Sequence, residues 1–176
     1  HKQTLKVSYQ PFSARRPKEF ILCPYLLKEF RNRWFLFGCT ADNLVLYNLA
    51  LDRIISIEPS NVPFQENPKF DSDVFFNDVI GVSKNINDTP RTIKFWATRE
   101  QSQYIQTKPL HSSQKLLSRS EEDGSCIFQI TVVVNFEMYS VFMSYGPGVK
   151  VIYPNQAVKF MREKLNEAAA LYDKFV

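Results

Sequence analysis

RWFLFGCT, residues 33–40, has the composition of a buried β-strand, because aromatic, aliphatic and β-branched side chains fill most of it. Two tight turns are predicted on either side, Arg31-Asn32 before it and Ala41-Asp42-Asn43 after it. Asn and Asp tolerate the left-handed backbone that such turns need. The stretch is therefore predicted to be the middle strand of an antiparallel sheet.

Four more strands are predicted in the first third of the chain, and no helix is predicted between them. They lie near Leu5–Gln10, Phe20–Phe30, Leu44–Asn48 and Ile54–Glu58. Short strands at this spacing are typical of a small antiparallel β-barrel, since closure removes the unpaired edges of a sheet. One long loop, residues 10–18, carries several cationic side chains and two prolines, and we expect it to be exposed.

The excess positive charge lies in this same part of the chain. The net charge of the 176 residues is +4, and residues 1–63 hold nine Lys or Arg against five Asp or Glu, which accounts for all of it. A basic surface favours an anionic partner such as nucleic acid. An ordinary solvated basic face is the alternative, and both interpretations stay open.

Composition also bounds the class of protein. No apolar run approaches the roughly 20 residues that cross a bilayer, and no charged-then-apolar leader opens the chain, so we expect no membrane partner. The three cysteines are widely separated and follow neither a disulfide framework nor zinc-ligand spacing. A cytoplasmic protein fits these features. The chain opens at His1 and enters a strand almost at once, so we expect a further domain to precede it.

A second module is predicted after a linker. Residues 62–88 shift to Pro, Asn and Asp, with one predicted helix, Asp71 to Ile80, ended by Gly81. The following elements are then predicted in the order β-α-β-β-α-β, which is the ferredoxin-like pattern: strand Thr92–Ala97, helix Arg99–Thr107, strand Gln114–Arg119, strand Cys126–Val134, helix Phe136–Ser144 and strand Val149–Tyr153.

A last helix is predicted from Pro154 onward. Its apolar side chains recur at steps of three and four residues, and this stripe is expected to pack on the sheet or on a second copy of the chain. The stripe consists of Val158, Met161, Leu165, Ala168 and Tyr172. The predicted fold class is therefore α+β, with a barrel at 1–62, a linker at 63–90 and a ferredoxin-like extension with its C-terminal helix at 91–176.

Several segments resemble the WYL domain and its C-terminal extension in order and spacing. For the domain they are LKVSYQPF at 5–12, PYLL at 24–27, RWFLFG at 33–38 and LDRI at 51–54; for the extension they are SYGPGVKVIYP at 144–154 and PLHSSQK at 109–115, the last similar to Bacteroidetes-type members. The resemblance implies an Sm/SH3-like barrel that senses an effector, behind an N-terminal helix-turn-helix that reads duplex DNA. It also implies a homodimer, and single-stranded DNA as one class of effector.

Two positions depart from the family pattern. Phe35 stands where the name-giving tripeptide has tyrosine, and Tyr47 stands where many members carry arginine. Both changes remove polar groups that could hold a phosphate or a base edge. The regulator assignment is unaffected, whereas the identity of the effector becomes more open.

The predicted binding site lies around the middle strand. Because strand side chains alternate, Trp34 and Leu36 share one face, which we expect to be core, and Arg33 lies with Phe35 on the other. Arg53 needs a partner, which Asp52, a backbone carbonyl or a bound anion could supply, so a structural role and a ligand contact are both open. The candidate residues, with cations for phosphates and aromatics for stacking on bases, are Tyr9, Arg15, Arg16, Lys18, Tyr25, Arg33, Phe35 and Arg53.

Catalysis is not predicted. His111 and Ser113 lack a Gly-x-Ser-x-Gly turn and an acid to orient the histidine, so hydrogen bonding within a loop is the simpler role. With two histidines and five glycines in the chain, no metal site and no phosphate-cradling glycine motif is expected, and no cofactor. The sequence predicts the effector-sensing part of a bacterial transcription regulator, and a ligand-free dimerisation module is the alternative.

Overall fold

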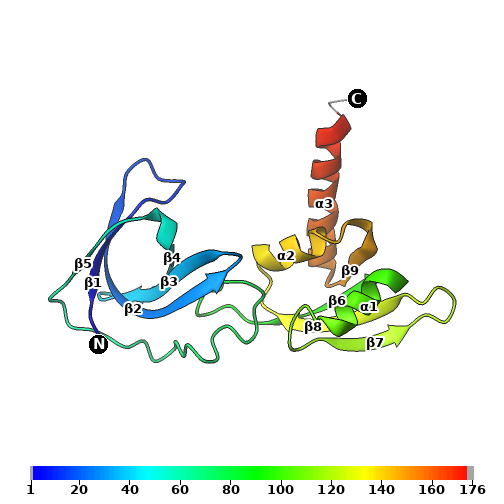
Figure 1. Ribbon diagram of the computed structural model, residues 1–176, viewed down its shortest axis with the longest axis horizontal. Coiled ribbons are helices and arrows are strands. Elements are labelled where there is room, and N and C mark those ends of the chain that lie inside the picture. Colours follow the sequence, from blue (N-terminus) through cyan, green and yellow to red (C-terminus); the bar gives the residue numbers. More distant parts are fainter. Residues whose placement is uncertain (1, 174–176) are drawn as a thin grey trace. The chain divides into compact units, whose positions relative to one another are not determined.

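The chain forms two compact units in the computed structural model, which describes residues 2–173 (Figure 1). The first unit contains the residues up to 76 together with 85–87, and the second contains 77–84 and the residues from 88 onward. Each unit has its own sheet and its own hydrophobic core.

The first unit is a five-stranded antiparallel sheet with the strand order β4-β3-β2-β1-β5. Its strands are β1 (Leu5–Tyr9), β2 (Lys18–Phe30), β3 (Arg33–Thr40), β4 (Leu46–Ala50) and β5 (Ile54–Pro59), and a short 3-10 turn, η1 (Leu51–Arg53), joins β4 to β5. All five predicted strands are confirmed, with shifts of at most two residues at their ends.

The predicted closure of these strands into a barrel is wrong. β4 and β5 are the two ends of the strand order, and no pairing between them occurs in the part of the chain that the structure describes. The η1 turn separates the two strands, and β5 then pairs with β1 alone. The long strand β2 bends, as Figure 1 shows, and the bulge between Pro24 and Leu26 contributes because proline has no N–H for the ladder. The result is a curved, open sheet.

One face of this sheet holds the small core of the first unit. Its buried residues are Val7, Tyr9, Leu22, Leu36 and Leu49. The prediction that Leu36 is core is confirmed, whereas the prediction for Trp34 is wrong, because its side chain is 51% exposed. β4 ends at Ala50 opposite Phe35, so no neighbouring strand on that side extends to Trp34.

The other face of β2 and β3 is covered by residues 64–76, which we call the covering segment. Phe76 packs edge-on against Phe37 at 4.9 Å between ring centroids, and Phe70 stacks on Tyr25 at 5.4 Å. The helix predicted from Asp71 to Ile80 is absent; the chain makes turns there, with the Phe75 N–H donating to the Asp71 carbonyl at 2.8 Å. Packing of its phenylalanines on the sheet and on one another outweighs the local helical preference.

The second unit is a four-stranded antiparallel sheet with the order β7-β8-β6-β9. Its elements are β6 (Arg91–Ala97), α1 (Arg99–Thr107), β7 (Lys115–Arg119), β8 (Cys126–Val132), α2 (Phe136–Met143), η2 (Gly146–Gly148), β9 (Val149–Tyr153) and α3 (Asn155–Tyr172). The predicted succession of strands and helices is confirmed. The core is built around Phe95, whose ring centroid lies 5.4 Å from that of Phe128 and 5.1 Å from that of Phe142.

Only the beginning of α3 is packed. Ala157 and Met161 are buried, but every described residue from Arg162 onward is exposed, including Leu165 (43%) and Tyr172 (76%). Only the N-terminal end of the predicted apolar stripe therefore packs against the core of the second unit. No described helix has the length and apolar content of a membrane span.

Candidate ligand-binding surface

The loop between β1 and β2 is anchored to η1. The Gln10 N–H donates to the Arg53 carbonyl at 3.0 Å, and a turn closes where the Ala14 N–H donates to the Pro11 carbonyl, also at 3.0 Å. Arg15 and Arg16 of the loop, and Lys18 at the start of β2, are exposed, as the sequence predicts. A loop tied at its base but open to solvent can present these charges to a ligand.

Arg53 stacks on an aromatic ring of this loop. Its guanidinium carbon lies 4.0 Å from the centroid of Phe12, whose side chain is 80% exposed. The Nε of Arg53 is buried and has no hydrogen-bond partner among the described residues. The arginine is thus held in a cation–π contact, with hydrogen-bonding capacity left over.

Arg33 is linked to this pair because it forms an ion pair with Asp52, the residue before Arg53. Its guanidinium is 3.4 Å from the Asp52 carboxylate, and both side chains are close to half exposed. Asp52 was one of the three partners open for Arg53, and in the structure Arg33 takes it. We call the set Phe12, Arg15, Arg16, Arg33 and Arg53 the basic surface.

The aromatic candidates Tyr9, Tyr25 and Phe35 are less exposed than the cations of the loop. Tyr9 is 6% exposed and belongs to the core. Tyr25 faces the covering segment, where its hydroxyl donates to the Gln65 carbonyl at 2.8 Å, and burial raises the pKa of this phenol far above its usual range. Phe35 is half-buried on the side of β3 away from Trp34. Tyr9 and Tyr25 therefore lie outside the basic surface, whereas Phe35 shares its side of β3 with Arg33.

Sequence reasoning missed two exposed aromatic residues. Phe12 is the only aromatic residue among the cations of the loop, which could have marked it as a surface ring. Trp34 lies just after the Arg31-Asn32 turn, and side chains beside a turn often lie beyond the end of the core. Its indole is half-exposed and projects from the face of β3 opposite to Arg33.

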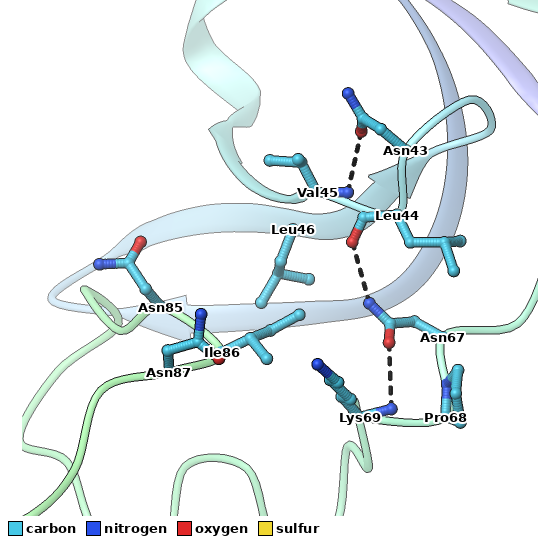
Figure 2. A pocket seen from close by; sticks show the side chains of 10 residues that line it. All are labelled: Asn43, Leu44, Val45, Leu46, Asn67, Pro68, Lys69, Asn85, Ile86 and Asn87. Carbon is cyan, nitrogen blue, oxygen red and sulfur yellow. Dashed lines mark hydrogen bonds between the residues drawn. The ribbon is translucent and has the colours of Figure 1, made fainter.

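A pocket of about 450 Å³ lies in the first unit between the β3–β4 turn, residues 67–69 and residues 85–87 (Figure 2). Its ten lining residues include four asparagines and no carboxylate. Asn67 joins the walls, because its amide donates to the Leu44 carbonyl and accepts from the Lys69 N–H, each at 3.0 Å, as the dashed lines in Figure 2 show. Amide and aliphatic side chains give this pocket a neutral character apart from Lys69.

His111 and Ser113 make the loop hydrogen bonds that the sequence predicts. The Ser113 hydroxyl lies 2.8 Å from His111 Nδ1 and 3.2 Å from the Thr131 carbonyl, and it accepts from the Thr131 N–H at 2.8 Å. The Ser113 N–H also donates to His111 Nδ1 at 3.2 Å, which requires an unprotonated nitrogen there. Through Ser113 the residues before β7 are thus hydrogen-bonded to Thr131 of β8.

The stability of the second unit should therefore depend on the protonation of His111. Burial lowers the pKa of its imidazole below the ordinary 6.5, so the unfolded chain binds the proton more readily than the folded one. This contribution to stability is complete above pH 6.5 and is lost as the pH falls toward the folded pKa. We expect His111→Asn, whose amide oxygen can accept from the Ser113 N–H, to flatten this part of the profile, measured as the difference from wild type in urea unfolding between pH 7.5 and pH 5. Parallel profiles for the two proteins would contradict the assignment.

No group of three or more His, Cys, Asp or Glu side chains suited to a metal ion occurs within residues 2–173.

The class of protein follows from comparison of the two units with known families. Residues 1–59 match the WYL domain, and residues 89–169 match the WCX domain. The chain belongs to the WYL-domain family and carries a WYL domain followed by a WCX domain. The family resemblance of the sequence is thus confirmed. No curated protein matches the chain by sequence.

Two solved structures match the chain, and the second of them, with a TM-score above 0.5, has a similar fold. The proteasome accessory factor B/C (PafBC) of Arthrobacter aurescens is 19% identical with a TM-score of 0.42, over 98% of this chain and 26% of its own length. A CRISPR Cas-related protein is 11% identical with a TM-score of 0.54, over 99% of this chain and 49% of its own length. The chain therefore spans about a quarter of the first and about half of the second.

Proposed function

We propose that this chain is the effector-sensing region of a DNA-binding transcription regulator, and that the basic surface of its WYL domain binds an anionic ligand. The pair of WYL and WCX domains supports the regulator class. The observation that carries the ligand proposal is Arg53, held against the exposed ring of Phe12 with a buried Nε that has no hydrogen-bond partner among the described residues.

The chemistry of this surface favours a single-stranded oligonucleotide. Arg15 and Arg16 are exposed on one loop and can contact successive phosphates, and Arg53 adds a guanidinium that already contacts the ring of Phe12. The exposed ring of Phe12 offers a face on which an unpaired base can stack. A duplex hides the faces of its bases, so aromatic groups of this kind favour a single strand.

In this proposal the two domains divide the work. Residues 1–62 bind the effector, and residues 63–90 connect this domain to the second one. Residues 91–176 have a strand order that fits the ferredoxin-like pattern, and they transmit the conformational change that binding causes. The relay would act on a helix-turn-helix domain in the same regulator, which would act as a cytoplasmic homodimer on duplex DNA.

Fluorescence anisotropy with a short fluorescent single-stranded DNA tests the ligand proposal. We expect saturable binding that weakens as salt rises, and a loss of at least about tenfold in affinity for Arg53→Ala, because a charge-assisted contact and the stacking are both removed. Arg53→Lys keeps the charge but not the planar stacking, and should lie between the two.

Arg162→Ala is the matched control, since it removes one positive charge from the exposed part of α3. Its affinity should stay within about twofold of wild type, because Arg162 belongs to the second unit and not to the basic surface, and an exposed charge that contacts no ligand is screened by salt. Absence of saturable binding, or equal losses for Arg53→Ala and Arg162→Ala, would contradict the proposal.

The exposed end of α3 supports a second candidate function, a dimerisation module that binds no ligand. Leu165, Leu171 and Tyr172 are 43%, 59% and 76% exposed on this helix. Sedimentation velocity of wild type and Leu165→Glu separates the two functions. A dimer that Leu165→Glu converts to monomers, without any DNA binding by wild type, would favour this second function. A monomeric variant that still binds DNA would favour the first.

A further inference from the structure

Cys23 and Cys39 face each other across the β2–β3 ladder. They are direct register partners in the antiparallel pairing, so their side chains project from the same face of the sheet. Directly opposite Cβ atoms lie about 4.5–5.5 Å apart, and a disulfide needs about 3.5–4.5 Å. Both thiols are free and fully buried. A small movement of the two strands would bring the sulfurs within bonding distance.

The covering segment is held on the sheet partly by these two sulfurs. The Asn67 amide Nδ2 donates to Cys39 Sγ at 3.1 Å, and the Gln65 backbone N–H donates to Cys23 Sγ at 3.3 Å. On the other side the Thr4 hydroxyl lies 3.8 Å from Cys23 Sγ. The two thiols therefore act as hydrogen-bond acceptors for two residues of the covering segment that are close in sequence.

We propose that Cys23 and Cys39 form a reversible disulfide that loosens the N-terminal half of the covering segment, residues 64–70. The oxidant is a peroxide. One thiolate attacks a peroxide oxygen, which gives a sulfenic acid and, for hydrogen peroxide, one water. The second thiol then attacks the sulfenic sulfur, the S–S bond forms and a second water leaves. Two thiols have lost two protons and two electrons, and one peroxide has been reduced to two waters. A dithiol reverses the step.

The consequence for the covering segment follows from the hydrogen bonds. Sulfurs drawn together into an S–S bond move away from the positions at which Gln65 and Asn67 meet them. Asn67 would keep its bond to the Leu44 carbonyl but lose the one to Cys39, and it lines the pocket of Figure 2. Oxidation would therefore alter a wall of this pocket.

Access limits the rate of the reaction. Burial raises the pKa of the Cys39 thiol, although the hydrogen bond from Asn67 opposes this effect, so the thiol is protonated while the covering segment lies over it. Residues 64–70 contain no helix or strand, and Gln65 and Glu66 are exposed. Local opening of such a segment costs less free energy than unfolding the sheet, and a molecule as small as hydrogen peroxide can then reach the sulfurs.

Peroxide treatment of the whole chain, followed by non-reducing peptide mapping, tests the bond itself. We expect a linked peptide pair that contains Cys23 and Cys39, that forms equally in Cys126→Ser, and that dithiothreitol removes. Cys126, buried in the second unit, is the matched thiol and should stay reduced. No linked pair under native conditions, or a pair that forms only in denaturant, would overturn the proposal.

Hydrogen exchange of the oxidised and reduced forms tests the loosening. The amides of Gln65, Lys69 and Phe70 are hydrogen-bonded within this region, and their exchange should be about tenfold or more faster after oxidation. The amide of Phe75, bonded to the Asp71 carbonyl at 2.8 Å, is the internal control and should be unchanged. If the four amides exchange at the same rates in the oxidised and the reduced protein, the proposal that the disulfide loosens the covering segment is wrong. Neither result depends on the proposed DNA ligand.

Discussion

Replacement of Phe95 by alanine is expected to lower the free energy of unfolding of the second unit by about 3–5 kcal/mol. The Phe95 side chain is completely buried in the middle of the core, stacked on Phe128 at 5.4 Å and tilted against Phe142 at 5.1 Å. β6, which carries it, pairs with both β8 and β9, so the surrounding backbone cannot easily collapse into the cavity.

Urea unfolding monitored by tryptophan fluorescence measures this effect unit by unit. The chain has two tryptophans, Trp34 in the first unit and Trp96 in the second, so a Trp34→Phe background reports on the second unit alone. Phe136→Ala is the control, because the same ring at the start of α2 is 74% exposed and should contribute little. Equal losses for the two variants would show that the core is not centred on Phe95.

Replacement of Gly38 by alanine is expected to destabilise the first unit by about 3 kcal/mol, at the upper end of the range for overpacked sites. A Cβ at this position would lie 2.5 Å from the Cys23 carbonyl oxygen and 3.0 Å from Leu22 Cγ. The oxygen belongs to the backbone of the neighbouring strand, so it cannot turn aside as a side chain would. The ladder between β2 and β3 would have to separate.

Unfolding of Gly38→Ala, followed through Trp34 in a Trp96→Phe background, gives the measurement. Gly146→Ala is the control: its φ of +52° carries the backbone strain of a left-handed residue, but a Cβ there would meet nothing within 4 Å. We expect about 1 kcal/mol for this control, observed in the second unit through Trp96 in the Trp34→Phe background. A Gly38→Ala protein as stable as wild type would mean that the sheet yields at this point.

The succession of elements was predictable because it rests on local signals. Strand Arg33–Thr40, helix Arg99–Thr107 and strand Val149–Tyr153 lie where the sequence predicts them. Alternation, turn residues such as Arg31-Asn32, and helix caps act within a few residues of the chain, so a single sequence carries them. The WYL resemblance of the first sixty residues is of the same kind, since it depends on order and spacing.

The errors share one cause, which is contact between residues distant in sequence. A helix was predicted from Asp71 to Ile80, but phenylalanines of the covering segment gain more by packing on β2 and β3. Trp34 was predicted to be buried by alternation alone, which cannot show that β4 ends opposite Phe35. Closure of the sheet likewise depends on the strands with which β5 pairs. β5 pairs with β1, which is distant in sequence, and not with β4.

The candidate site shows the same division. The sequence by itself determined the family, the strands and helices, and the presence of cations on an exposed loop, because these depend on local composition and spacing. Only the tertiary structure decided that Arg53 stacks on Phe12, that Asp52 pairs with Arg33, and that Cys23 faces Cys39. Each of these pairs joins different strands or loops, and strand register, which a single sequence leaves open, fixes which side chains meet.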